Sequence, residues 1–200
     1  MIADAELDAA LRELRAGRPI VLPTDTVYGI AALPGERGAV DAVFAAKGRP
    51  DDKPLPVLGA TVRQLESIAW LDASARALAR AFWPGPLTLV VPRARGLSWR
   101  LGAGAADTVA VRVPRCPIAL RVLEQSGPLA VSSANRSGRR PATTAAEARS
   151  AFDTAVRVYL DGGRRDGVPS SVVSLIDGPR VLRSGAIAES DVTRALAENA

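Results

Sequence analysis

Apolar residues recur along the chain with two different periods, and each period predicts a different kind of element. In the first 17 residues, Leu7, Leu11 and Leu14 fall on one face of a helix that Asp4 can cap and Gly17 can end. Elsewhere the apolar residues form short, almost continuous runs, which predict buried strands. The chain therefore combines amphipathic helices with short strands.

The same criteria predict the other elements. Strands are expected at 19–23, where the run continues into TDTVYGI, and at 55–59, 87–91, 108–113, 128–133, 155–163, 170–178 and 179–183. Helices are expected around Val40, Val43 and Phe44, at 61–69, at 72–83 with Asp72 as cap, at 117–127 with Pro117 at its start, from a capping box at Thr144 and Glu147 onwards, and at 191–198. The last two strands can form a hairpin around Asp177-Gly178.

Helices and strands intermix without a strict strand–helix–strand alternation, which indicates an α/β fold with an open, twisted, mixed sheet flanked by helices. The sequence shows no internal repeat, low-complexity tract or linker, so we expect one domain over residues 1–200. No apolar run is long enough to cross a bilayer, and the acidic N-terminus does not resemble a signal peptide. We therefore expect a cytoplasmic protein that does not associate with a membrane.

The residue types that are missing narrow the possible chemistry. The chain has no histidine and one cysteine, Cys116. These counts exclude Ser-His-Asp and Cys-His catalysis, histidine-based zinc sites, sites with several cysteines and an internal disulfide. Any chemistry must use hydroxyls, amides, carboxylates or fixed positive charges.

The net charge of +5 favours an anionic partner, such as a nucleotide, RNA or a phosphorylated metabolite. An arginine-rich surface that reflects biased composition is an equally good interpretation. Only two of the 26 basic residues are lysines, and Lys47 and Lys53 fall in one segment, KGRPDDKP. Because lysine is a compact point charge and arginine a wide fork, the pair is consistent with a tight phosphate site, although coincidence explains it too.

Four polar clusters lie at strand ends or in loops, where functional residues concentrate. They read PTDTVYG, KGRPDDKP, AVRVP and SSANRSGRRPATT. Their hydroxyls, amides and cations suit the binding of anionic oxygens and of an amino-acid-like group better than acid–base catalysis. No phosphate-binding loop of the form G-x-x-x-x-G-K-[ST] is present, and GAGAAD at 102–107 lacks a third glycine, which favours a simple loop.

Six motifs resemble the YrdC-like (TsaC-type) threonylcarbamoyl-AMP synthase family: PTDTVYGI, KGRP followed by KPL, WPGPLTLVV, VAVRVP, SSANRSG and VLRSGAI, in this order between about Ile20 and Ile187. The resemblance implies a YrdC-like fold with a large basic cavity. It implies synthesis of threonylcarbamoyl-AMP and pyrophosphate from L-threonine, bicarbonate or CO2, and ATP. The product would go to the threonylcarbamoyl-transferase complex that makes t6A at position 37 of tRNA. Longer members carry an extra C-terminal domain, which we do not expect here.

The resemblance also assigns nucleotide-side residues. Lys47 and Arg49 match the family's Lys-x-Arg signature, and Ser133 and Asn135 match Ser-x-Asn; in the family these residues hold the phosphates. Lys47 and Arg49 are thus the expected catalytic residues, because fixed cations stabilise the charge that builds up during attack on the α-phosphorus. Thr108, Thr143 and Arg183 correspond to further nucleotide-side positions. Taken alone, Ser133 and Asn135 also fit an ordinary turn at the start of a loop.

On the threonine side, the resemblance implies Thr24, Lys53, Arg112 and Ser171. Arg112 would pair with the threonine carboxylate, a bidentate role that suits a guanidinium group. Lys53 departs from the His or Asn of many relatives. Tyr28 is expected as cavity wall.

Mg2+ is expected to arrive on the ATP phosphates and not at a site of its own, and nothing assigns Asp25, Asp51 or Asp52 as its ligands. Two other readings remain open. One is a double-stranded RNA-binding or ribosome-associated module, which would also account for a contact with tRNA and would need basic residues across an exposed face. The other is a paralogue with a different carbamoyl or adenylyl acceptor.

Overall fold

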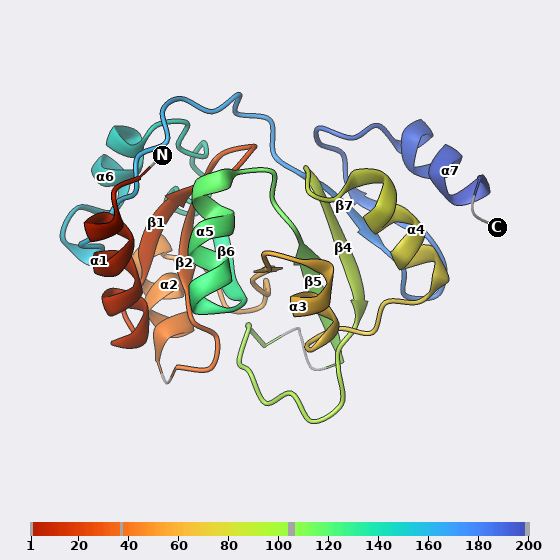
Figure 1. The fold of residues 1–200 in the computed structure, drawn as a ribbon, viewed down its shortest axis with the longest axis horizontal. Coiled ribbons are helices and arrows are strands. Elements are labelled where there is room, and N and C mark those ends of the chain that lie inside the picture. The colour runs from red at the N-terminus through yellow and green to blue at the C-terminus, as the bar shows by residue number, and fades with distance from the viewer. Residues whose placement is uncertain (1, 37, 104–106, 199–200) are drawn as a thin grey trace.

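Eight strands form one mixed sheet in the computed structural model, which describes residues 2–36, 38–103 and 107–198 (Figure 1). The strands are β1 (Ile20–Pro23), β2 (Tyr28–Ala32), β3 (Val57–Leu58), β4 (Leu87–Pro92), β5 (Thr108–Arg112), β6 (Leu129–Ser133), β7 (Ser171–Ser174) and β8 (Arg180–Arg183). Their order in the sheet is β1-β2-β6-β3-β5-β4-β7-β8. The β3/β5 and β4/β7 pairs are parallel and the other neighbours antiparallel, which confirms the predicted mixed sheet.

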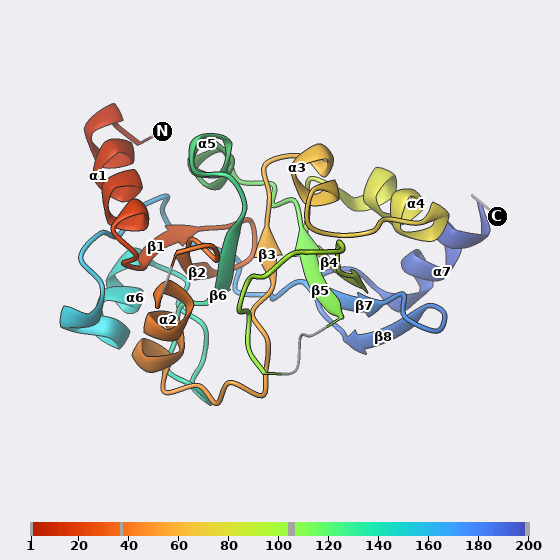
Figure 2. The ribbon, with the colours of Figure 1, turned by 90° about the horizontal axis from the view of Figure 1, so that it is seen from below.

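Helices cover both ends of this sheet. They are α1 (Asp4–Arg15), α2 (Ala39–Lys47), α3 (Val62–Glu66), α4 (Ala73–Phe82), α5 (Pro117–Ser126), α6 (Ala145–Phe152) and α7 (Glu189–Ala197), with a 3-10 turn η1 (Asp153–Ala155). α1 and α5 lie on one side of β1, β2 and β6, and α2 and α6 lie on the other side (Figure 2). α4 and α7 pack together at the opposite end of the sheet.

Strand alternation separates a packed face from a polar face in β4 and β5. Leu87, Leu89 and Val111 belong to the core cluster that also contains α4 residues such as Leu78. Their neighbours along the strands point to the other face and line cavities: Thr88, Val90, Thr108, Ala110 and Arg112. The cavity floor is therefore a consequence of the period-2 pattern.

Several local signals act as the sequence predicts. The side chain of Asp72 accepts a hydrogen bond from the Ala75 amide, and that of Thr144 accepts one from the Glu147 amide, so both residues cap their helices. β7 and β8 form the expected hairpin, with Asp177 and Gly178 in the left-handed region at φ 57° and 101°. No helix in the described part of the chain is long and apolar enough to cross a membrane.

Other predictions about the elements are wrong. Ala3, not Asp4, is the N-cap of α1, and the Asp4 carboxylate instead pairs with Arg121 on α5. The last helix begins at Glu189, two residues before the predicted start. The helix predicted at 61–69 covers only Val62–Glu66, and the strand predicted at 55–59 only Val57–Leu58.

The strand predicted at 155–163 is reduced to one bridge, between Val21 and Tyr159. Beyond it, the hydroxyl of Tyr28 donates to the Gly163 carbonyl at 2.8 Å and accepts from the Gly162 amide at 3.0 Å. Pro23, the next residue of β1 that faces this segment, has no N–H to continue the ladder, and the Tyr28 hydroxyl takes the backbone groups of Gly162 and Gly163, so pairing with β1 stops there. The segment then crosses from the α6 side to β7 along the top of the view in Figure 1.

The run PIVLPTDTVYGI contains two strands instead of one. Thr24, Asp25, Thr26 and Val27 form a tight turn, after which β2 returns antiparallel to β1 with Pro23 opposite Tyr28. The Thr24 amide donates to the Val27 carbonyl at 3.1 Å, which closes the turn. The turn places the hydroxyls of the PTDT motif beside the open face of β5.

Candidate active site

Two adjoining cavities lie on the open face of β4 and β5, with volumes of about 180 and 320 Å3. They share five lining residues: Arg49, Pro56, Thr88, Ser170 and Arg183. The smaller cavity, here the inner cavity, also contacts Thr24, Arg112 and Ser133, whereas the larger, the outer cavity, contacts Thr108. One continuous site therefore runs from the PTDT turn to the start of β5.

Arg112 occupies the floor of the inner cavity and is 5% exposed. Its Nη2 donates to Asp25 Oδ1 at 2.6 Å, Nη1 to Thr26 Oγ1 at 3.3 Å, and Nε to the Gly85 carbonyl at 2.9 Å. Burial lowers the pKa of Arg112 and the charge of Asp25 opposes this effect, so the group stays a cation. The arginine is thus fixed in orientation before any ligand binds.

The hydroxyls of the PTDT turn stand next to this arginine. Thr24 Oγ1 donates to the Val27 carbonyl at 2.6 Å and lies 3.0 Å from Thr26 Oγ1. Both threonines are buried and line the inner cavity, together with the apolar Leu58 and Val131. This end of the site presents a cation and hydroxyls beside a small apolar wall, which suits a small polar molecule with an anionic group.

Two more arginines line both cavities. Arg49 follows α2 and donates from Nε to the Lys53 carbonyl at 3.0 Å, and burial lowers its pKa, with Asp52 opposing. Arg183 reaches from β8 to Ser170, donating from Nη2 to its carbonyl at 2.7 Å. Neither lining set includes Asp or Glu among the described residues. The site therefore has a positive potential that favours phosphates and carboxylates.

The Ser-x-Asn motif forms a tight loop at the end of β6. Ser133 lines the inner cavity and its Oγ donates to Asn135 Oδ1 at 2.5 Å. Asn135 does not line either cavity: its Nδ2 donates to the carbonyls of Arg136 and Arg139 at 2.8 and 2.9 Å. Lys47 is also absent from both linings, because its ammonium group donates to the carbonyls of Ser133 and Asn135.

The structure thus divides the predicted site residues into two groups. Those that line the cavities are Thr24, Arg49, Thr108, Arg112, Ser133 and Arg183. Those outside both linings are Lys47, Lys53, Asn135, Thr143 and Ser171. Ser171 Oγ donates to the Ile187 carbonyl at 2.6 Å, and Thr143 bonds to Glu147, so these two hydroxyls support neighbouring segments. The roles of all eleven residues in ligand binding stay predictions.

Four hydroxyl-bearing lining residues were missed from the sequence: Thr26, Thr88, Ser132 and Ser170. Thr88 Oγ1 and Ser170 Oγ lie 2.9 Å apart on the wall shared by the cavities. The alternation in LTLVV, in which Thr88 stands between two core leucines, was a signal that could have identified it. Tyr28 lines the inner cavity as predicted. No group of three or more His, Cys, Asp or Glu within the described residues could hold a metal ion.

Comparisons with known proteins identify the family to which the chain belongs. The family model Sua5/YciO/YrdC, described as "Telomere recombination", matches residues 12–185. A Mycobacterium tuberculosis protein is 42% identical over 195 residues, which cover 96% of this chain and 89% of the relative. A Pyrococcus abyssi protein named threonylcarbamoyl-AMP synthase is 41% identical over 189 residues, covering 92% of this chain.

The solved structure of P. abyssi Sua5 complexed with L-threonine superimposes with a TM-score of 0.92 at 38% identity, over 100% of this chain. This chain spans 55% of the P. abyssi relative and 59% of the solved Sua5 chain, so it corresponds to a little over half of that longer protein. The resemblance found in the motifs is confirmed over nearly the whole sequence. The chain belongs to the Sua5/YciO/YrdC family.

Proposed function

We propose that this protein is an L-threonylcarbamoyladenylate synthase, which joins L-threonine, bicarbonate or CO2, and ATP into threonylcarbamoyl-AMP and pyrophosphate for the t6A37 modification of tRNA. The observation that carries the proposal is the continuous cationic site itself. Arg112 lies at its inner end, while Arg49, Arg183 and Ser133 provide cations and a hydroxyl along its wall. The names of the relatives support the same substrate pair.

The inner cavity is the proposed threonine subsite. A guanidinium group carries five N–H donors. Within the described part of the chain, three are used by Gly85, Thr26 and Asp25, which leaves one N–H on each terminal nitrogen of Arg112. These two N–H groups can donate to a threonine carboxylate in bidentate fashion without displacing Asp25. Leu58 and Val131 provide apolar surface for the substrate methyl group.

The reaction then needs two bond-forming steps. The threonine amine adds to CO2 and releases a proton, giving a carbamate. A carbamate oxygen attacks the α-phosphorus of ATP, and the bond to the β-phosphate breaks, so that pyrophosphate leaves with the electron pair. Arg49 and Arg183 can stabilise the charge on the α- and β-phosphates, since fixed cations in a partly enclosed site need no reorganisation. Mg2+ would enter bound to ATP and neutralise phosphate charge, because the described residues that line the two cavities include no carboxylate.

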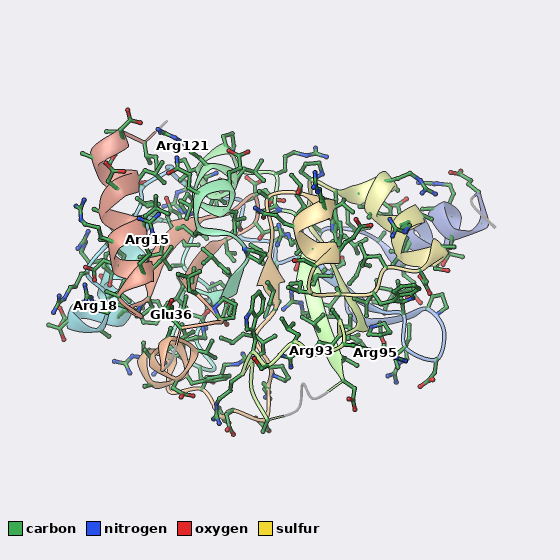
Figure 3. All side chains as sticks on the ribbon, turned by 60° about the horizontal axis from the view of Figure 1, so that its bottom comes forward. Arg15, Arg18, Glu36, Arg93, Arg95 and Arg121 are labelled. Atoms are coloured by element: carbon green, nitrogen blue, oxygen red, sulfur yellow. The ribbon has the colours of Figure 1, made fainter. Side chains whose placement is uncertain are left out.

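The RNA-binding alternative requires a different distribution of positive charge from the one that the synthase requires. An RNA-binding module needs basic residues spread across an exposed face. The arginines labelled in Figure 3 lie on both halves of the molecule: Arg15, Arg18 and Arg121 near α1 and α5, Arg93 and Arg95 near the end of β4. The enclosed cations of the two cavities favour a small anionic ligand instead. A direct contact with tRNA or with the transferase complex would use other surfaces.

Ligand-coupled thermal unfolding tests the proposal. A non-cleavable α,β-methylene analogue of ATP and L-threonine should together raise the Tm by more than the sum of their separate effects, because adjacent subsites of one continuous site let each bound ligand contact the other and strengthen its binding to the folded state. D-threonine, which has the same charges and atoms, should add little to the effect of the analogue. Strictly additive shifts, or equal shifts with the two enantiomers, would count against a shared stereospecific site.

A further inference from the structure

Lys47 is the last residue of α2 and one of the most buried charged residues of the chain, at 2% exposure. Its Nζ donates to the Ser133 carbonyl at 2.5 Å and to the Asn135 carbonyl at 2.7 Å. Its own carbonyl accepts a hydrogen bond from the Ser137 amide at 2.8 Å. Both the side chain and the backbone of Lys47 are thus attached to the segment 133–139, which we call the Ser-Asn loop.

The Ser-Asn loop is further held by its own side chains. Ser133 Oγ donates to Asn135 Oδ1, and Asn135 Nδ2 donates to the carbonyls of Arg136 and Arg139. Of the residues that form this network, only Ser133 lines a cavity. Lys47 and Asn135 therefore make an ordered support behind the one hydroxyl that reaches the site.

We propose that Lys47 is a positioning residue, whose ammonium group shapes the Ser-Asn loop and acts on the nucleotide through Ser133 without contacting the phosphates. The identity of the nucleotide rests on the function proposed above. The Ser133 carbonyl also accepts from the Asn135 amide at 3.0 Å, so without the ammonium group it would keep one partner, whereas the Asn135 carbonyl would lose the donor that Lys47 provides, and a buried acceptor without a donor is destabilising. The ammonium charge also offsets the negative ends of these carbonyl dipoles behind a site that receives anions.

The geometry explains why this position is a lysine. The two acceptors belong to residues only two apart, and a compact ammonium group can donate to both from one nitrogen. A planar guanidinium group is wider and would force the carbonyls apart. Gly48, at φ 58°, then turns the chain so that Arg49 enters the cavities. Within the Lys-x-Arg motif of this chain, Arg49 faces the cavities, whereas Lys47 holds the Ser-Asn loop in place.

The two lysines of this chain allow a direct test. In protein labelled with 15N at the lysine side chains, Lys47 and Lys53 give separate signals, which the Lys53→Arg variant assigns. Isothermal titration first establishes that ATP is bound. A phosphate within about 4–6 Å would raise the pKa of Lys47 by about 1–3 units. We expect ATP to move the Lys47 titration midpoint by less than about one unit; a larger upward shift would overturn the positioning role.

The variant Lys47→Met tests the loop in the free protein, so this arm does not depend on the proposed function. Hydrogen exchange in residues 133–139 should accelerate at least tenfold relative to other protected segments, and unchanged exchange there would refute the proposal. As a control, Gln64→Leu removes a half-buried side chain that joins the Ala60 amide to the Leu123 carbonyl. It should leave exchange in the Ser-Asn loop unchanged.

Kinetics separate positioning from a general loss of stability. A displacement of reacting groups by about 1 Å can cost about a hundredfold in rate. Lys47→Met should therefore lower kcat by about that factor at saturating ATP, while the KM for threonine changes less than threefold. Gln64→Leu should lower the Tm but retain kcat. If both variants lose kcat in proportion to their loss of stability, Lys47 has only a structural role and the proposal is wrong.

Discussion

The Arg112 guanidinium lies 2.6 Å from the Asp25 carboxylate, and the side chains are only 6% and 12% exposed. The second carboxylate oxygen of Asp25, Oδ2, is buried and has no partner in the described structure. An ion pair this deep makes each member dependent on the other. Arg112 is consequently both a proposed substrate ligand and the counter-charge of Asp25.

This dependence predicts that Arg112→Ala has two separable effects. It leaves a buried carboxylate unpaired, so unfolding free energy should fall by about 3–5 kcal/mol, and threonine binding should be lost as well. The double variant Arg112→Gln/Asp25→Asn removes both charges and should recover most of the stability. It should not recover threonine binding. Denaturant unfolding and calorimetric titration measure the two effects, and recovery of threonine affinity in the double variant would contradict the assignment.

Arg49→Lys should raise the KM for ATP by about 10- to 100-fold, since charge-assisted hydrogen bonds to a forked donor contribute about 1.5–3 kcal/mol and a single ammonium group does not reproduce them. Arg95→Lys makes the same chemical change on an exposed residue outside both cavities (Figure 3). Steady-state kinetics on the two variants should differ clearly. An equal response would show that Arg49 contributes only general charge.

Lys47 should give activity and stability opposite dependences on pH. Burial lowers its pKa from 10.5 to about 8, with Arg49 adding to the effect. Between about pH 8 and 10.5 the unfolded chain holds this proton and the folded protein does not, so raising the pH favours the folded state at this site. Below pH 8 both states hold it and the contribution is constant.

Turnover should instead decline as pH rises through about 8, because the ammonium charge that orders the Ser-Asn loop is lost. Lys47→Met should show neither effect, so the difference between wild type and variant isolates this group from others that titrate in the same range. Chemical denaturation and initial rates from pH 7 to 10.5 provide both curves. A fall in the unfolding free energy of the wild type relative to that of Lys47→Met, as the pH increases from 8 to 10.5, would have the wrong sign for a buried lysine.

The sequence predicted the mixed α/β sheet well because strands and helices carried clear periods and caps, such as Asp72 and Thr144. It failed where a long-range side chain decided the outcome. The apolar run after Ala155 is typical of a strand, but the Tyr28 hydroxyl, more than 130 residues away in sequence, takes the backbone partners of Gly162 and Gly163. No local pattern contains that information.

The candidate site was predicted to a similar extent. Arg49, Arg112 and Ser133 were found because motifs and strand ends identify them. The sequence does not distinguish a cation that faces a ligand from one that faces backbone carbonyls, so Lys47 and Arg49 were assigned the same role. Their separation depends on the left-handed turn at Gly48, which sends the two side chains to different surroundings.

Serine should be used less well than threonine, by about tenfold in kcat/KM. It lacks the methyl group that Leu58 and Val131 would contact, and one methyl group in an apolar pocket is worth about 1–3 kcal/mol. Parallel measurements at low substrate concentration, under identical ATP, give the ratio. Equal kcat/KM values would show that this apolar wall does not contact the substrate.

The central claim is that the cavities assemble threonylcarbamoyl-AMP. The most direct measurement is mass spectrometry of the products after short incubation of the purified protein with ATP, Mg2+, L-threonine and 13C-bicarbonate, with pyrophosphate measured in parallel. We expect an adenylate that contains threonine and one 13C atom, formed in equal amounts with pyrophosphate, and its loss in Arg49→Ala but not in Arg95→Lys. If folded protein that binds ATP yields neither the labelled adenylate nor pyrophosphate, the protein is not a threonylcarbamoyl-AMP synthase.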